Sequence, residues 1–157
     1  MATYLRDPGG LLLSVSSGGS LSNYGRDRLG TVTALTSGSQ GPTNTYRCDP
    51  WGQAIGGSSS GYDPFGYTGT YKDAATGLYQ MGARYYQPAS GRFTQLDPHP
   101  GQLLTVNRYA YTACNPTNYT DPTGLFSPLF TAEDRGTGLL HRSCCLRLHL
   151  RSRRFGA

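Results

Sequence analysis

The chain has 157 residues, a length that allows one compact domain and argues against a catalytic domain joined to a separate binding domain. The net charge of +5 is uneven: residues 1–125 carry eight Lys/Arg against seven Asp, and residues 126–157 carry six Arg against one Glu and one Asp. The basic charge therefore belongs to the tail. The overall charge does not support specific nucleic-acid binding by residues 1–125.

Composition also bears on fold class and location. The 22 glycines and 10 prolines predict many turns, and the 12 tyrosines favour the half-buried surface of a β-sheet. The N-terminal residues contain no apolar core of a signal peptide, and no stretch approaches the 18 apolar residues of a membrane span, so we expect no transmembrane segment. The four cysteines fit neither a disulfide scaffold nor a Cys-x-x-Cys metal site, which leaves their redox state open: Cys48, Cys114, Cys144 and Cys145.

The first 66 residues contain a repeat of the form Tyr-x-x-Asp-x-x-Gly. Three copies align and a shorter echo comes after them: Tyr4–Gly10, Tyr24–Gly30, Tyr46–Gly52 and Tyr62–Gly66. Within each repeat the Asp-x-x-Gly part, with Asp at the first position of the turn and Gly at its fourth, favours a type I β-turn. The short alternating segments between these turns, such as 31–35 and 44–48, predict strands. Each repeat is therefore predicted to form one antiparallel β-hairpin. Because an isolated hairpin is marginally stable, we expect the sheet to continue into neighbouring repeats.

A different pattern covers residues 67–125. Tyr79, Met81, Ala83 and Tyr85 alternate with polar residues, which predicts one half-buried strand between turns at Gly77 and Gly91. A second strand is predicted over 107–111, and no helix is predicted before residue 126. The predicted fold class is all-β, with an irregular or weakly structured C-terminal tail.

Short motifs succeed one another in a fixed order in this second region. They are Thr76–Tyr79, Ala83–Tyr86, Gly91–Phe93, Asn107–Tyr111 and Asp121–Leu125, the last reading Asp-Pro-Thr-Gly-Leu. In order and spacing they resemble the repeat-associated core of the RHS (rearrangement hot spot) proteins, and the upstream repeats resemble the YD repeats of that family. We therefore divide the chain into YD/RHS repeats (1–66), an RHS repeat-associated core (67–125) and a variable basic C-terminal tail (126–157).

The resemblance implies a structural function in a polymorphic toxin. In this family YD repeats wind into a hollow shell, the core forms a plug, and the variable polypeptide beyond the core is often a toxin carried as cargo. Relatives are secreted or lie at the cell surface, and an immunity protein is an expected partner in some of them. The chain has too few repeats for a complete shell, so we expect preceding YD/RHS repeats or another RHS chain to complete the sheet.

The resemblance also implies an alternative, enzymatic function: aspartate-dependent self-cleavage after the D-P-x-G-L motif, here between Leu125 and Phe126. Asp97 and Asp121 lie in Asp-Pro turns, and if they share a pocket, like-charge repulsion would keep a proton on one, so that one acts as acid and the other as base. Arg92 is a candidate to orient a carboxylate or the scissile carbonyl. The residues alone favour a turn cap for each aspartate and a surface role for Arg92; only the resemblance supports catalysis.

Two weaker hypotheses concern metals and sugars. The tail contains residue types that bind zinc: His141, Cys144, Cys145 and His149. Their spacing matches no zinc site, so no metal or cofactor is predicted. Trp51, Tyr109 and Tyr111 are interpreted as packing residues, with a surface carbohydrate-binding module as the alternative. The 32-residue tail is too short for a folded toxin enzyme and is interpreted as a degenerate or truncated cargo region.

Overall fold

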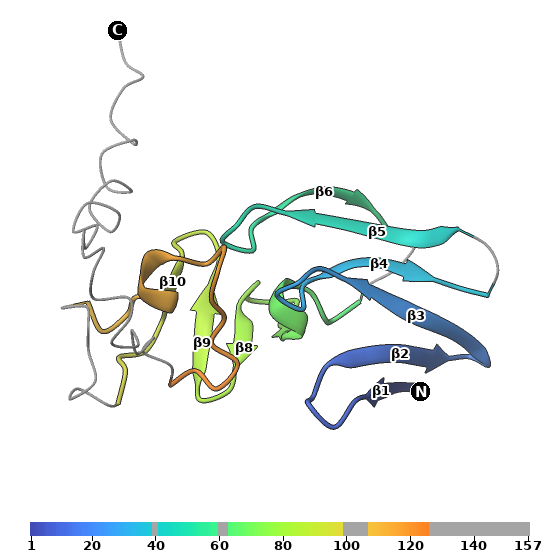
Figure 1. Cartoon of the computed structure of the whole chain (residues 1–157), viewed down its shortest axis with the longest axis horizontal. Helices are drawn as coiled ribbons and strands as arrows, with labels where there is room; N and C mark the ends of the chain where they lie inside the picture. Colours follow the sequence, from blue (N-terminus) through green and yellow to red (C-terminus); the bar gives the residue numbers. More distant parts are fainter. Residues whose placement is uncertain (39–40, 60–62, 99–106, 126–157) are drawn as a thin grey trace, which may run out of the picture.

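The computed structural model describes residues 1–38, 41–59, 63–98 and 107–125. These residues form two antiparallel β-sheets, shown in Figure 1, which confirms the all-β prediction. The first sheet runs in chain order through β1 (Ala2–Arg6), β2 (Leu12–Ser17), β3 (Ser20–Arg26), β4 (Val32–Thr36), β5 (Pro42–Cys48) and β6 (Ala54–Ser58). The second has the order β10 (Arg92–Phe93), β9 (Arg84–Gln87), β8 (Tyr79–Met81) and β7 (Tyr71–Lys72). Two short 3-10 turns accompany them, η1 (Tyr67–Gly69) and η3 (Thr112–Cys114), and no helix within these ranges is long and apolar enough to cross a membrane.

The three repeats have the same turn, as the sequence predicts. In each, the glycine amide donates to the carbonyl of the aspartate three residues earlier, at 2.9, 3.1 and 3.0 Å. The carboxylate of each aspartate accepts the amide four residues later: Asp7 from Leu11, Asp27 from Thr31, and Asp49 from Gln53. The glycines have φ near +84°, a conformation that residues with a Cβ seldom adopt. Local chemistry alone therefore sets the position of each hairpin.

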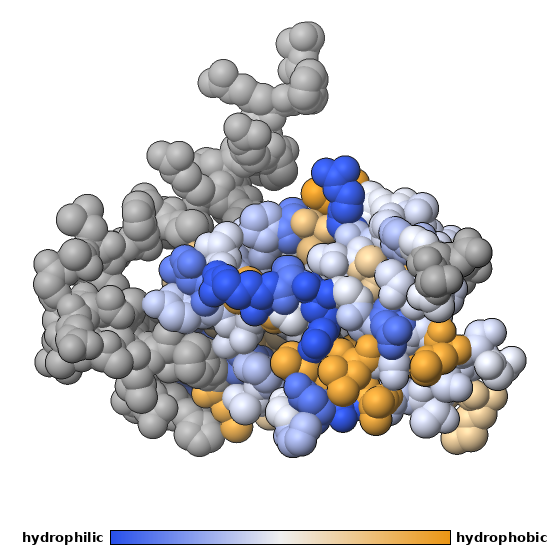
Figure 2. Space-filling model, turned by 45° about the vertical axis from the view of Figure 1, so that its right-hand side comes forward, coloured by the Kyte–Doolittle hydropathy of each residue, from blue (hydrophilic) through white to orange (hydrophobic). Residues whose placement is uncertain are grey.

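The repeat tyrosines contribute to the core of the first sheet. Tyr24 is buried with Leu12, Val32 and Leu35, and other side chains pack around this cluster: Tyr4, Val15, Tyr46 and Phe65. Large apolar side chains on β1 to β3 and their turns stay exposed: Leu5, Leu11, Leu13 and Leu21. Figure 2 shows apolar patches between hydrophilic areas on one face of the molecule. The first sheet thus has one packed face and retains uncovered apolar surface near its β1 edge.

The second sheet has an aromatic core that also holds the third repeat. Its buried members are Tyr67, Tyr79, Met81, Tyr86, Phe93 and Tyr111. The Tyr67 hydroxyl donates to the Pro50 carbonyl at 2.8 Å, and the Tyr86 hydroxyl donates to the Trp51 carbonyl at 2.7 Å. Tyrosine suits both positions because its ring packs in the core of the second sheet while its hydroxyl donates to a backbone carbonyl of the third repeat. The turn of the third repeat is thereby fixed on the second sheet.

The prediction of one strand through residues 79–85 is wrong. Tyr79 and Met81 are buried as expected, but the chain turns at Gly82, whose φ is +53°, and re-enters the sheet as β9. The turn shifts the buried register by one residue, so Ala83 and Tyr85 are exposed while Arg84 and Tyr86 are buried. Turns at Gly77 and Gly91 are present as predicted, with φ of +72° and +65°.

The prediction of a strand over 107–111 is also wrong. The segment forms a turn in which the Ala110 amide donates to the Asn107 carbonyl at 3.1 Å, and the Asn107 side chain accepts the Tyr109 amide at 3.0 Å. One isolated bridge joins Ala110 to Arg92 of β10. An asparagine that accepts its own downstream amide favours a turn over an extended strand.

Candidate active site around Arg84

Arg84 lies at the start of β9 and is the centre of a buried ionic cluster. Its Nη2 atom is 3.4 Å from Oδ2 of Asp97 and 3.2 Å from Oδ2 of Asp121. All three side chains are almost inaccessible to solvent, with exposed fractions of 3% for Arg84, 4% for Asp97 and 1% for Asp121. The structure thus brings the two sequence-predicted aspartates together on one guanidinium.

The rest of the Arg84 guanidinium contacts the main chain. Its Nε donates to the carbonyl of Gly124, and its Nη1 lies 3.4 Å from the carbonyl of Arg108. Its Cζ is 3.6 Å from the ring centroid of Phe93, a cation–π arrangement that covers one side of the group. Burial lowers the pKa of Arg84, while the charges of Asp97 and Asp121 act in the opposite direction. An arginine remains cationic under these conditions, so it can hold two carboxylates.

Asp121 is both a turn cap and a member of this cluster. Its Oδ1 accepts the Leu125 amide at 3.2 Å and the Thr123 hydroxyl at 3.1 Å, while Oδ2 contacts Arg84. The i to i+4 carboxylate contact repeats the one made by the aspartates of the three repeats. The two interpretations of this residue are therefore compatible, because each carboxylate oxygen has a different partner.

The segment before the predicted cleavage point is docked against the turn between β8 and β9. The Ala83 amide donates to the Thr123 carbonyl at 2.9 Å. Both Gly82 and Gly124 have positive φ, and a Cβ on Gly124 would overlap the carbonyl oxygen of Met81. These close approaches require glycine, and they place the peptide group between Gly124 and Leu125 within reach of Arg84 and Asp121.

The other predicted site residues lie elsewhere. Arg92 is exposed on β10, next to Phe93, and so stands apart from the buried cluster. Leu125 is described and partly buried, whereas Phe126 and the tail with its histidines and cysteines lie outside the described residues. Sequence reasoning missed Arg84, although it stands within the quoted Ala83–Tyr86 motif, because a single-strand register placed it on the exposed face.

The aromatic residues considered for sugar binding have different positions. Tyr111 is fully buried, and Trp51 packs against the core of the second sheet, as expected of packing residues. Tyr109 is 37% exposed.

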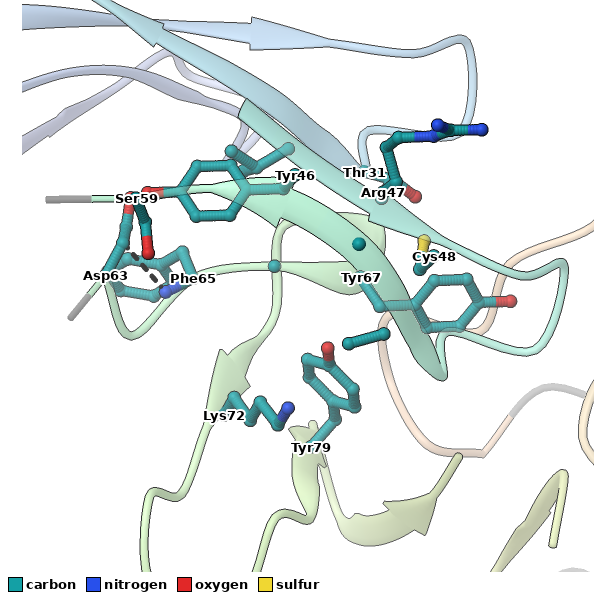
Figure 3. A pocket seen from close by; sticks show the side chains of 14 residues that line it. Thr31, Tyr46, Arg47, Cys48, Ser59, Asp63, Phe65, Tyr67, Lys72 and Tyr79 are labelled. Atoms are coloured by element: carbon teal, nitrogen blue, oxygen red, sulfur yellow. Dashed lines mark hydrogen bonds between the residues drawn. The ribbon is translucent and has the colours of Figure 1, made fainter. Parts of the chain in front are cut away.

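A cavity of about 300 Å³ lies between the two sheets, with the half-buried side chain of Asp63 at its edge (Figure 3). Asp63 accepts the Phe65 amide at 2.9 Å and the Tyr24 hydroxyl at 3.2 Å through Oδ1, while Oδ2 is buried without a hydrogen-bond partner among the described residues. Burial raises the pKa of Asp63, and the two hydrogen bonds oppose this increase. Lys72 and Tyr79 face the cavity from the second sheet. The Oδ2 atom of Asp63 is thus shielded from solvent where the two sheets meet, a region called the joint between the sheets below.

Comparison with family models decides the relationship of this fold to known proteins. Residues 1–120 match the model of the Teneurin YD-shell domain. The chain belongs to this YD-shell family. The match spans both sheets, from β1 through η3 to the approach to Asp121, and it confirms the resemblance to RHS and YD-repeat proteins.

Several similar curated proteins are bacterial toxins or nucleases. The chain is 35% identical over 128 residues to the tRNA3(Ser)-specific nuclease WapA of Bacillus spizizenii, and 40% identical over 81 residues to the toxin protein Tse5 of Pseudomonas aeruginosa. These matches cover 78% and 52% of the chain but 6% of each relative. The chain therefore spans a small fraction of the length of these proteins.

Similar solved structures support the same fold. The crystal structure of TcdB2-TccC3 without the hypervariable C-terminal region matches with a TM-score of 0.69 at 24% identity, over 79% of this chain and 6% of that one. The TcdB2-TccC3-Cdc42 structure matches with a TM-score of 0.66 at 26% identity, again over 79% of this chain and 6% of the other. The two-sheet arrangement is thus present within much larger proteins.

Proposed function

We propose that residues 1–125 form the closing segment of a toxin-type YD shell, ahead of a variable C-terminal region that the shell carries. The observation that carries this proposal is the open edge of β1. Within the described residues β1 pairs with β2 alone, and Leu5 on β1 and Leu21 on β3 remain exposed. An unpaired strand with exposed apolar side chains favours the addition of another strand.

The family match and the relatives support this proposal. The match to a YD-shell model covers both sheets, and the named relatives include toxins that are far longer than this chain. TccC3 has a hypervariable C-terminal region, which corresponds in kind to the basic residues after Leu125. The expected partner is therefore a set of preceding YD repeats whose last strand pairs with β1.

Hydrogen exchange tests the pairing of β1. This chain would replace the matched segment of TcdB2-TccC3, and amide exchange at residues 2–6 would be compared between the hybrid and the chain alone. We expect strong protection of these amides in the hybrid, with the central strand β4 protected in both proteins as an internal reference. Equal exchange of residues 2–6 in the two proteins would contradict the proposal.

A second function is supported by the Arg84 cluster. We propose that Asp97 and Asp121 hydrolyse the Leu125–Phe126 bond once in each molecule. The supporting observation is that both buried carboxylates contact one nitrogen of Arg84, which also binds the Gly124 carbonyl through Nε. Two neighbouring carboxyl groups can serve as the general base and the general acid in the hydrolysis of a peptide bond.

The proposed reaction uses one water molecule. One carboxylate removes a proton from the water as its oxygen bonds to the Leu125 carbonyl carbon, and the other carboxyl donates a proton to the Phe126 nitrogen as the C–N bond breaks. The products are a carboxylate on Leu125 and a free amine on Phe126. Arg84 holds the two aspartates and the preceding peptide group in place.

Intact mass spectrometry of the expressed chain tests this second proposal. We expect two fragments that meet between Leu125 and Phe126, and each of Asp97→Asn and Asp121→Asn should leave the chain whole. Arg47→Met, at an exposed position on β5, provides a control that should still be cut. A single full-length species at every pH tested would rule out self-cleavage of this chain.

A further inference from the structure

Arg108 is a second arginine beside the ionic cluster, and it contacts the main chain of Asp97. Its Nε donates to the Asp97 carbonyl at 3.1 Å, and its Nη2 donates to the same oxygen. In the opposite direction the Asp97 amide donates to the Arg108 carbonyl at 3.0 Å. Both backbone polar groups of Asp97 are therefore hydrogen-bonded to Arg108: the amide to its carbonyl and the carbonyl to its guanidinium.

Arg108 also contacts Arg84. The carbonyl that accepts the Asp97 amide is the one that lies 3.4 Å from Nη1 of Arg84. Arg108 thus contacts both members of the Arg84–Asp97 ion pair: its main-chain carbonyl contacts both residues, and its side chain contacts Asp97. A change in the position of Arg108 would alter the distance between them.

The backbone around Arg108 is itself fixed. The Asn107–Ala110 turn is closed by its own hydrogen bond, and the Phe93 amide of β10 donates to the Tyr109 carbonyl at 2.9 Å. Phe93 is the ring that lies against the Arg84 guanidinium. The guanidinium of Arg108 therefore extends from a firmly held turn, as expected of a group that positions another side chain.

We infer that Arg108 is a positioning residue for the aspartate pair: its guanidinium fixes the main chain of Asp97 so that the carboxylate meets Arg84 and Asp121. This inference rests on the proposed self-cleavage. Two donors of the same guanidinium, Nε and Nη2 of Arg108, converge on the Asp97 carbonyl oxygen, which fixes the direction of this peptide group. A lysine offers a single compact charge in place of the paired donors of a guanidinium.

The test compares the full chain with Arg108→Lys, Arg108→Met and the control Arg47→Met. We expect Arg108→Met to slow cleavage by about tenfold to a hundredfold, the loss that corresponds to one charge-assisted hydrogen bond, and Arg108→Lys to recover part of the rate. The pH profile of the cleavage rate should shift in Arg108→Met, whereas a merely structural role would lower the amount of folded protein without moving the profile. Equal cleavage rates and pH profiles in Arg108→Met and the unchanged chain would overturn the inference.

A second readout separates this inference from the proposed function. If the unchanged chain is never cut, the self-cleavage proposal fails, and the carbon-13 chemical shifts of the Asp97 and Asp121 carboxyl groups at neutral pH still test the role of Arg108. We expect the Asp97 signal to move in folded Arg108→Met, because the guanidinium that holds the main chain of Asp97 is lost, with a smaller change at Asp121. An unchanged Asp97 signal in folded Arg108→Met would overturn the positioning role.

Discussion

The Oδ2 atom of Asp121 lies 3.2 Å from Nη2 of Arg84, and both side chains are almost completely buried. This contact joins β9 to the Asp-Pro-Thr-Gly-Leu motif, 37 residues away in the chain. The end of the described fold is thus fixed to the centre of the second sheet by an ionic contact that no local pattern produces.

Removal of the Arg84 charge should destabilise the fold strongly. In Arg84→Met two buried carboxylates lose their cation, and the expected loss in unfolding free energy is about 3–5 kcal/mol. Arg92→Met makes the same chemical change at an exposed site on β10 and should stay within about 0.5 kcal/mol of the unchanged chain. Urea unfolding followed by tyrosine fluorescence measures both variants. Similar midpoints for Arg84→Met and Arg92→Met would contradict the structural role of the cluster.

The docking of the terminal motif should depend on Gly124. Both Gly124 and Gly77 have positive φ, but a Cβ meets the Met81 carbonyl at Gly124 and nothing within 4 Å at Gly77. Gly77→Ala should therefore cost about 1 kcal/mol of backbone strain, and Gly124→Ala about 1–3 kcal/mol more because of the overlap. Thermal unfolding of the two variants provides the comparison. Equal losses of stability in Gly77→Ala and Gly124→Ala would contradict the expected overlap between the added Cβ and the Met81 carbonyl.

The repeat turns should be sensitive to the acceptor on the aspartate. Asp27 accepts the amides of Leu29 and Thr31 through Oδ1, so Asp27→Ala should lower the unfolding free energy by about 1 kcal/mol. Asp27→Asn keeps an oxygen at this position and should lose less. Chemical unfolding at neutral pH measures the difference between the two variants. If Asn is as damaging as Ala, the carboxylate contributes through its charge and not through these hydrogen bonds.

Asp63 should make the stability of the joint between the sheets depend on pH. Because burial raises the pKa of this carboxyl in the folded state, its contribution is fully present below the ordinary aspartate pKa of about 4 and is lost as the pH rises through the folded-state pKa. Asp63→Asn removes this titration. The melting temperature of the variant relative to the unchanged chain should therefore increase from pH 4 to pH 8. A constant difference across this range would show that Asp63 titrates alike in the folded and unfolded chain.

Local chemistry explains which parts of the fold could be predicted. The turns at Asp7, Asp27 and Asp49 depend on residues within five positions of one another, so their sequence pattern is sufficient. The turn at Gly82 is different, because the Ala83 amide finds its partner in the carbonyl of Thr123. An alternating pattern cannot contain this distant contact, and the predicted strand therefore continued through it.

Distance along the chain also explains which residues of the Arg84 cluster could be predicted. Asp97 and Asp121 were identifiable from the Asp-Pro pairs and the resemblance, and the structure places them on one guanidinium. An alternation that continues through Gly82 predicts an exposed Arg84, and the arginine that the sequence analysis names as a candidate is Arg92. The signal available in the sequence is an arginine followed directly by two tyrosines, Tyr85 and Tyr86.

The central claim, that this chain closes a larger YD shell, is tested most directly by the protease resistance of a peptide attached to its C-terminal side. In the hybrid in which this chain replaces the matched segment of TcdB2-TccC3, a reporter peptide fused after Leu125 would be exposed to a protease. The account predicts that the reporter survives in the intact hybrid and is digested when Leu5→Pro disrupts the β1 edge. Digestion of the reporter at equal rates in the hybrid and in the Leu5→Pro variant would contradict it.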